Sequence, residues 1–361
     1  MSSLLQFLLG LVLLVVGAET LVRGASKLAA AAGVSPLVVG LTIVAFGTSS
    51  PELAVSVQSS WRGQGDLALG NVVGSNIFNV LFILGVSALV TPLIVARQVI
   101  RQEVPVMILA SVLLFVIAMD GRIGRLDAAV LAALLLAYTV FLVVQSRAHA
   151  RMARDDETGV QQAAGWDRHW TIQIALVLGG LCLLVLGSDM LVNAAIDFAR
   201  AFGVSELVIG LTVVAAGTSM PEVATSVMAS LRGHRDIAVG NVIGSNVFNI
   251  LGVLGISGLV APGFLEVAPS ALAFDLPVMV AVALLCLPLF FTGSVITRGE
   301  GALFLACYVA YTVFLILAAQ ESPLLSIYRT LLIWVLVPVT FAVLLLVTIR
   351  AVRGSNGRGA A

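Results

Sequence analysis

Long apolar runs, each containing a few polar positions, follow one another along almost the whole chain. Eleven of these runs approach the roughly 20 residues that an α-helix needs to cross a bilayer. They cover residues 4–32, 36–60, 67–90, 104–119, 126–146, 171–201, 206–230, 237–260, 273–291, 301–319 and 328–349. The runs are longer than the short strands of a membrane barrel, and they do not alternate apolar with polar residues as those strands do. The pattern therefore predicts an all-α polytopic membrane protein.

Composition agrees with this prediction. Of the 361 residues, 60% are hydrophobic and only 11% are charged, whereas a soluble domain carries about 25% charged residues. The expected surroundings are therefore a lipid bilayer rather than water. The formal net charge is zero, so nothing indicates a nucleic-acid partner. The three cysteines all lie within apolar runs, where they are expected to pack as small hydrophobic residues.

The two halves of the chain repeat each other. A shift of 170 positions aligns residues 38–90 with 208–260, and 33 of these 53 pairs are identical. The similarity continues to residues 138–141, which recur at 311–314. Each repeat contains five predicted spans, and because five is odd, the second copy must enter the membrane from the opposite side. Inverted repeats are typical of secondary transporters, which bind substrate near the middle of the membrane. Duplication alone would also fit a channel.

The repeat divides the chain into four predicted parts. Residues 1–146 form the first half with spans one to five, and residues 147–170 form a polar linker. Residues 171–320 form the second, inverted half with spans six to ten, and residues 321–361 form an extra span and a basic tail. With the N-terminus outside, 12 loop arginines fall inside and five outside. The positive-inside rule therefore predicts an outside N-terminus, a cytoplasmic linker and a cytoplasmic C-terminus.

The closest match within the internal repeat places a glutamate inside two apolar spans. Residues 47–52 read Gly-Thr-Ser-Ser-Pro-Glu, and residues 217–222 read Gly-Thr-Ser-Met-Pro-Glu. The proline lacks an amide hydrogen and clashes with the carbonyl four residues earlier, so each helix is expected to break and expose backbone oxygens. A charge at a helix centre costs about 2.5–3.5 kcal/mol on insertion scales. Neither span has a basic residue at mid-membrane, so Glu52 and Glu222 indicate a function rather than a local ion pair.

Other oxygen-bearing residues share the helical face of each glutamate and of the span that follows. Helical spacing places Thr48, Ser49 and Ser56 beside Glu52, and Thr218, Ser219 and Ser226 beside Glu222. In the next span, Asn71, Ser75 and Asn79 are spaced by four, as are Asn241, Ser245 and Asn249. The simpler alternative for this second face is hydrogen bonding between helices.

The combined donor set contains carboxylate, amide, hydroxyl and backbone oxygens, without a nearby sulfur or imidazole. The carbonyls freed by the helix breaks could include those of Ala45, Thr48, Ala215 and Thr218. The three histidines all lie in predicted loops. An all-oxygen site favours hard cations such as Ca²⁺, Mg²⁺ or Na⁺ and disfavours zinc and copper. Two carboxylates balance one divalent cation.

The paired Gly-Thr-Ser-x-Pro-Glu and Gly-Asn-Val-x-Gly-Ser-Asn blocks resemble the α-repeats of the calcium/cation antiporter superfamily, most closely those of prokaryotic sodium/calcium exchangers. The resemblance covers about residues 5–320. It implies a ten-helix exchanger core in the cell (inner) membrane of a prokaryote, which exchanges Na⁺ for Ca²⁺ by alternating access. It implies no enzymatic activity and no cofactor besides the transported ions. The implied ion ligands are Glu52, Glu222, Ala45, Thr48, Ser49, Ser75, Ala215, Thr218, Ser219, Ser245 and Asn79, with Asn249 at the matching central position of the second repeat.

Two features distinguish this chain within that resemblance. Some relatives, including the potassium-dependent branch, carry aspartate at the position of Asn249, so asparagine argues against coupling to K⁺. The extra span after residue 320 has no counterpart in the ten-helix core. The glutamate blocks also differ from the Gly-Asn-Ala-Ala-Glu type of proton/calcium exchangers, but a Ca²⁺/H⁺ antiporter remains the alternative function. The sequence leaves the oligomeric state open.

Two further function classes are less favoured. A cation channel would not need the paired broken helices, which suggest one occluded central site. An intramembrane hydrolase would need a base for Ser49 or Ser219, and no histidine lies within a predicted span. Glu19 and Asp189 occupy equivalent positions in the first span of each repeat, and they are expected to serve structure or gating rather than to bind the ion.

Overall fold

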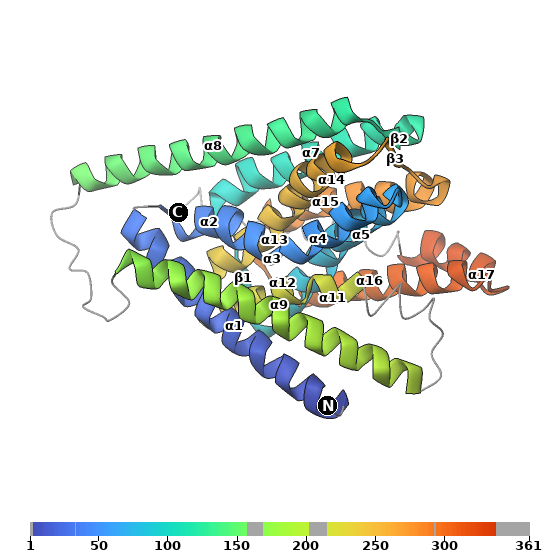
Figure 1. Cartoon of the computed structure of the whole chain (residues 1–361), viewed down its shortest axis with the longest axis horizontal. Helices are drawn as coiled ribbons and strands as arrows, with labels where there is room; N and C mark the ends of the chain where they lie inside the picture. The colour runs from blue at the N-terminus through green and yellow to red at the C-terminus, as the bar shows by residue number, and fades with distance from the viewer. Residues whose placement is uncertain (1–2, 33, 157–168, 202–214, 292–293, 337–361) are drawn as a thin grey trace, which may run out of the picture.

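The structure is a computed structural model, and it describes residues 3–32, 34–156, 169–201, 215–291 and 294–336. These residues are almost entirely helical (Figure 1). The helices of the first half are α1 (Ser3–Ala32), α2 (Pro36–Val39), α3 (Ala45–Thr48), α4 (Ser50–Trp61), α5 (Gly65–Phe78), α6 (Leu84–Val90), α7 (Val104–Ile117) and α8 (Arg125–Asp156). Those of the second half and the C-terminal part are α9 (Trp170–Ala201), α11 (Ala215–Thr218), α12 (Met220–Leu231), α13 (Arg235–Phe248), α14 (Leu254–Val260), α15 (Leu276–Phe291), α16 (Arg298–Ala319) and α17 (Leu325–Leu331).

Short turns of wider or tighter helix join several of these elements. The wider, π-helical turns are Gly40–Val44, Asn79–Ile83, Val99–Glu103, Asn249–Val253, Ala271–Asp275 and Leu332–Leu336, and Ala118–Asp120 is a 3₁₀ turn. Two of the π-helical turns begin at the predicted ligands Asn79 and Asn249. Single π-helical turns inside α-helices are rare and occur frequently at functional sites.

Eight helical segments of the described residues are long and apolar enough to cross a membrane, and the bent pair Pro36–Thr48 and Ser50–Trp61 makes a ninth. They correspond to the predicted spans one to six and eight to ten. Of predicted span seven, residues 215–230 fall within the described residues, and of the eleventh, residues 328–336. The remainder of those two predictions lies outside them. The protein is therefore a multi-pass helical membrane protein.

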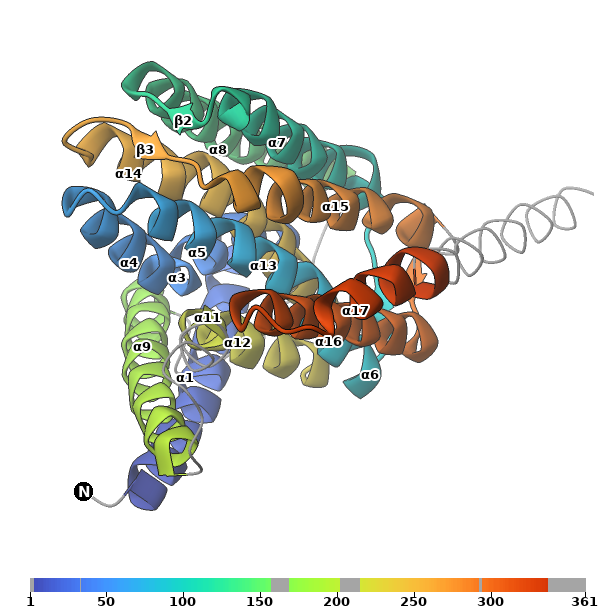
Figure 2. The ribbon, with the colours of Figure 1, turned by 90° about the vertical axis from the view of Figure 1, so that its right-hand side faces the viewer.

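The first and sixth spans form an antiparallel pair that also packs on α12. Helices α1 and α9 lie side by side at one edge of the molecule in both views (Figures 1 and 2). Gly10 packs against Gly187, and Gly17 packs against Gly180. Because Gly180 and Gly187 are the repeat equivalents of Gly10 and Gly17, the contact is reciprocal between the two repeats. A Cβ atom at Gly180 would lie 2.6 Å from the backbone nitrogen of Leu21. Small residues that let two backbones approach closely are a common basis of helix association in membranes.

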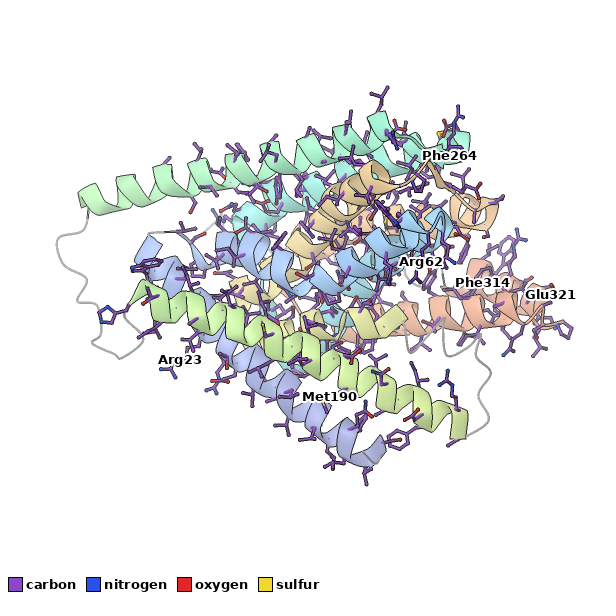
Figure 3. All side chains as sticks on the ribbon, viewed as in Figure 1. Arg23, Arg62, Met190, Phe264, Phe314 and Glu321 are labelled. Atoms are coloured by element: carbon purple, nitrogen blue, oxygen red, sulfur yellow. The ribbon has the colours of Figure 1, made fainter. Side chains whose placement is uncertain are left out.

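The third and eighth spans form the centre of the remaining helices. In the most apolar windows of Gly65–Val90 and Arg235–Val260, 78% and 89% of the residues are buried. The broken helices pack against them, with α4 on α5 and α12 on α13. Side chains fill the space between the ribbons (Figure 3). The polar repeat motifs therefore lie in the most buried part of the protein.

Two short antiparallel strand pairs connect the halves. Strand β1 (Leu93–Ile94) pairs with β4 (Val295–Ile296), and β2 (Arg122–Ile123) pairs with β3 (Leu265–Glu266). Each pair joins one strand of the first half to one of the second. The strands were not predicted, because two residues are too few to show the alternation by which a strand is recognised in a sequence.

The helix of the fifth span is longer than the span itself. The membrane span ends at Ser146, where the sequence predicts it, whereas α8 continues as a helix to Asp156. The added segment consists mostly of alanine, arginine and methionine, which favour the helix, and it contains no proline or glycine. Polarity thus marked the end of the apolar span rather than the end of the helix.

Candidate cation site

Each glutamate lies just after a break in its helix. Ser49 separates α3 from α4 with φ −80° and ψ 9°, and Ser219 separates α11 from α12 with φ −90° and ψ 9°. A proline follows two positions later in both cases and cannot donate to the carbonyl four residues earlier. In the first half the two segments meet at a bend of 47°. The break directs the serine and the glutamate of each segment toward the opposite half.

The two halves exchange hydrogen bonds through these residues. The Ser49 hydroxyl donates to Oε1 of Glu222 at 2.9 Å, and the Ser219 hydroxyl donates to Oε1 of Glu52 at 2.7 Å. All four side chains are fully buried. The glutamates are 170 positions apart in the sequence, and each contacts the helix break of the other repeat. The structure therefore brings the two carboxylates to a common place between the halves.

Several buried oxygens of the two repeated motifs have no hydrogen-bond partner in the protein. Among the described residues, buried oxygens that accept or donate no hydrogen bond include Glu52 Oε2, Glu222 Oε2, Asn79 Oδ1, Asn249 Oδ1 and Ser245 Oγ. Leaving a buried polar atom unpaired costs about 1–3 kcal/mol, and more for a charged group. The glutamate and asparagine oxygens of this set occupy matching positions in the two halves, and the set fits a dehydrated hard cation that would satisfy the oxygens together.

The remaining predicted ligands lie on the same elements. The hydroxyl oxygens of Ser75 and Ser219 lie 3.3 Å apart, which adds a second contact between the repeats. Thr48 is buried and donates to the side-chain oxygen of Asn241 at 3.1 Å. Ala45 and Ala215 begin α3 and α11, the short helices before each break, and Thr218 ends the second of them. The sequence predicted a freed carbonyl at Ala45, but this carbonyl accepts the Ser49 amide at 3.0 Å, so the break does not leave it without a partner.

The outer asparagine of each motif serves packing between helices. Asn71 donates to the Ser56 hydroxyl at 2.9 Å and to the backbone carbonyl of Glu52 at 3.2 Å. Asn241 donates in the same way to Ser226, at 3.0 Å. The simpler interpretation, hydrogen bonding between helices, therefore holds for these two members of the polar face. They attach the glutamate helix to the span that follows it.

Several polar contacts were not identified from the sequence. Asn76 and Asn246 belong to the repeated motif but were not predicted to have a role. Asn76 accepts from Asn249, and Asn246 accepts from Asn79, so both contacts cross between the halves. Glu103 accepts from the Tyr138 hydroxyl at 2.5 Å, and Asp275 accepts from Tyr311 at 2.8 Å. The two tyrosines are the first residues of the repeated segments 138–141 and 311–314, and this repetition is the feature of the sequence that could have indicated the contacts. These two pairs join the fourth span of each half to its fifth.

Glu19 lies away from the site. It accepts from Arg232, with the closest nitrogen and oxygen 2.6 Å apart, and so links α1 to the turn after α12. Its counterpart Asp189 is exposed and forms no ion pair with any described residue. This placement agrees with a structural or gating role rather than ion binding.

We expect Glu19→Gln to leave the Ca²⁺ dissociation constant within about twofold of the native value, because exposed ion pairs contribute only about 0–1 kcal/mol and Glu19 lies outside the site. Equilibrium binding of Ca²⁺ to the purified variant in detergent measures this. A tenfold loss of affinity would place Glu19 in the binding site.

The fold and the buried oxygens together define a class: a multi-pass membrane protein that can hold a hard cation between two related halves. Comparison with known proteins agrees. A family model described as sodium/calcium exchanger protein matches residues 2–144 and 172–317. The chain belongs to this family, and it is accordingly a cation/Ca²⁺ antiporter, a transporter rather than a catalyst.

Individual relatives are similar over most of their length. The putative antiporter CaxA of Alkalimonas amylolytica is 40% identical over 309 residues, which are 84% of this chain and 95% of that protein. The sodium/calcium exchanger MaX1 of Methanosarcina acetivorans is 36% identical over 345 residues, covering 87% and 98%. A solved structure of the sodium-calcium exchanger NCX_Mj superposes with a TM-score of 0.72 at 32% identity, and covers 86% of this chain and 97% of that one.

Proposed function

We propose that this protein exchanges Na⁺ for Ca²⁺ across the cell (inner) membrane of a prokaryote, with its N-terminus outside and its C-terminus in the cytoplasm. The observation that carries the proposal is the set of unpaired buried oxygens around Glu52 and Glu222. Two carboxylates supply the charge that balances one dehydrated Ca²⁺. The neighbouring hydroxyl, amide and backbone oxygens resemble the six to eight oxygen ligands that Ca²⁺ typically takes.

Alternating access would use the pair formed by α1 and α9. Helices α1 and α9 pack on each other along a glycine-lined contact, whereas the ion site lies on α3 to α5 and α11 to α13. A pair that moves as one unit past a fixed core could open the site first to one side and then to the other. This is the motion that resemblance to the exchangers implies.

The choice of coupling ion depends on the titratable groups at the site. Asn79 and Asn249 bear no charge at any physiological pH, so only Glu52 and Glu222 could exchange protons for Ca²⁺. Their hydroxyl neighbours and the unpaired amide oxygens are instead suitable ligands for Na⁺. This composition favours Na⁺ over H⁺, and Ca²⁺/H⁺ exchange is the second candidate because both carboxylates could in principle be protonated.

We expect Ca²⁺ uptake into proteoliposomes to require Na⁺ inside, to be independent of K⁺, and to respond to membrane voltage. If three Na⁺ replace one Ca²⁺, as the family implies, one positive charge moves per cycle, and each charge is worth about 2.3 kcal/mol per 100 mV. Labelled Ca²⁺ flux is measured at clamped voltage with Na⁺, K⁺ or only a pH gradient imposed.

Each alternative has its own signature in this assay. Strict dependence on K⁺ would contradict the argument from Asn79 and Asn249. Equal flux driven by a pH gradient alone would favour the proton-coupled function. Ca²⁺ flux without any counter-ion gradient would indicate a channel.

A further inference from the structure

Four asparagines form a hydrogen-bonded chain where the two repeats meet. Asn79 donates its side-chain nitrogen to Oδ1 of Asn246 at 3.0 Å, and Asn249 donates to Oδ1 of Asn76 at 3.2 Å. All four side chains are at most 3% exposed. The side-chain oxygens of Asn79 and Asn249 are the unpaired oxygens already described in the cation site.

Acceptor-only groups fix the direction of these hydrogen bonds. Asn76 donates to the backbone carbonyl of Asn246 at 3.2 Å, and Asn246 donates to the carbonyl of Asn76 at 3.3 Å. Their amide nitrogens also face sulfur atoms of Met279 and Met107. A backbone carbonyl and a thioether can accept but cannot donate. The side-chain nitrogens of Asn76 and Asn246 must therefore face these acceptors. Their side-chain oxygens must then face Asn249 and Asn79.

The orientation of Asn76 and Asn246 determines the orientation of Asn249 and Asn79. Because the oxygen of Asn246 faces Asn79, Asn79 must present its nitrogen there and its oxygen on the opposite side. Asn76 determines the orientation of Asn249 in the same way. If the amide of Asn79 or Asn249 turned over, its NH₂ group would point at the cation. Its oxygen would then face the side-chain oxygen of Asn246 or Asn76, and the hydrogen bond between them would be lost.

We infer that Asn76 and Asn246 are positioning residues, which hold the amides of Asn249 and Asn79 with their carbonyl oxygens toward the ion. This inference rests on the proposed cation site and adds to it a pair of residues that do not bind the ion themselves. Each repeat thereby orients a ligand of the other, so ion affinity depends on contact between the halves.

A double-mutant cycle tests the inference, because a carboxylate has an oxygen in both positions and does not need to be oriented. We expect Asn76→Ala to weaken Ca²⁺ binding by about tenfold or more when residue 249 is asparagine. In the Asn249→Asp background the same substitution should change affinity less than about threefold. Equilibrium Ca²⁺ binding to the full chain in detergent measures both. The mirror cycle, with Asn246→Ala and Asn79→Asp, should behave alike.

Asn71→Ala is the matched control. It also removes an asparagine that bonds two neighbours, but it does not contact Asn249. Its effect should be equal in the two backgrounds. If Asn76→Ala does not fold, Asn76→Leu keeps a similar volume and removes the same donor and acceptor.

The outcomes separate this inference from the proposed function. A native protein that binds no Ca²⁺ would overturn the cation site and the positioning role with it. Binding by the native protein, together with equal losses whether residue 249 is asparagine or is changed to aspartate, would show a merely structural role for Asn76. Unchanged affinity in both the alanine and leucine variants would also overturn the inference. Strong coupling to residue 249, and none for Asn71, supports it.

Discussion

Glutamine at position 52 or 222 is expected to reduce Na⁺-driven Ca²⁺ uptake to background. Glutamine keeps the size of the side chain and one carbonyl oxygen, so the Ser219 or Ser49 hydroxyl still has an acceptor. The substitution removes one of the two charges that balance Ca²⁺. Unit charges 4 Å apart attract by about 4 kcal/mol at an effective dielectric constant of 20. A loss of that size corresponds to about three powers of ten in affinity.

The folded state should survive both substitutions, because a neutral side chain costs less to place inside a membrane than a charged one. The melting temperature in detergent, measured without Ca²⁺, is therefore expected to be equal to or above that of the native protein. Glu300→Gln is a matched control. Glu300 is also buried, but it caps the start of α16 together with Thr297 and lies outside the site. Uptake by the control should persist, and uptake by either site variant at the native rate would place the ion elsewhere.

The components of the site could be predicted from the sequence because the chain carries them twice. A glutamate after Ser-x-Pro in one apolar span is compatible with a kinked helix, but two copies in opposed repeats indicate a shared site. The same reasoning placed Asn79 and Asn249 near Glu52 and Glu222. The structure brings the glutamates together by reciprocal bonds from Ser49 and Ser219, although spacing alone cannot state which oxygen faces which donor.

Contacts between elements distant in the sequence could not be predicted. Asn76 and Asn246 lie one position after Ser75 and Ser245, and helical spacing offered no reason to separate them from other polar packing residues. Their role depends on which backbone carbonyl of the opposite repeat they meet. The bond between Glu103 and Tyr138 likewise depends on how the fourth span crosses the fifth. Periodicity identifies the buried face of a helix, not its partner on that face.

The contact between α1 and α9 leads to the second large expected effect. Gly180→Val should abolish transport, whereas Gly179→Val should leave it close to native. A Cβ at Gly180 would meet three backbone atoms of α1 within 2.6–2.9 Å, and backbone cannot move aside as a side chain can. A Cβ at the neighbouring Gly179 meets nothing within 4 Å. The two variants therefore add the same side chain at adjacent positions, one inside the helix contact and one outside it.

The loss at Gly180 should come from motion and packing rather than from ion binding. Overpacking a close contact costs typically about 1–3 kcal/mol, so the melting temperature should fall for Gly180→Val and not for Gly179→Val. Because the carboxylates and amides of the site lie on other helices, the Ca²⁺ dissociation constant of both variants should stay within about threefold of native. Labelled Ca²⁺ uptake and equilibrium binding on the same preparations separate the two effects. Normal uptake by Gly180→Val would show that α1 and α9 need not remain in close contact during the transport cycle, and a lost affinity would show that their packing shapes the ion site itself.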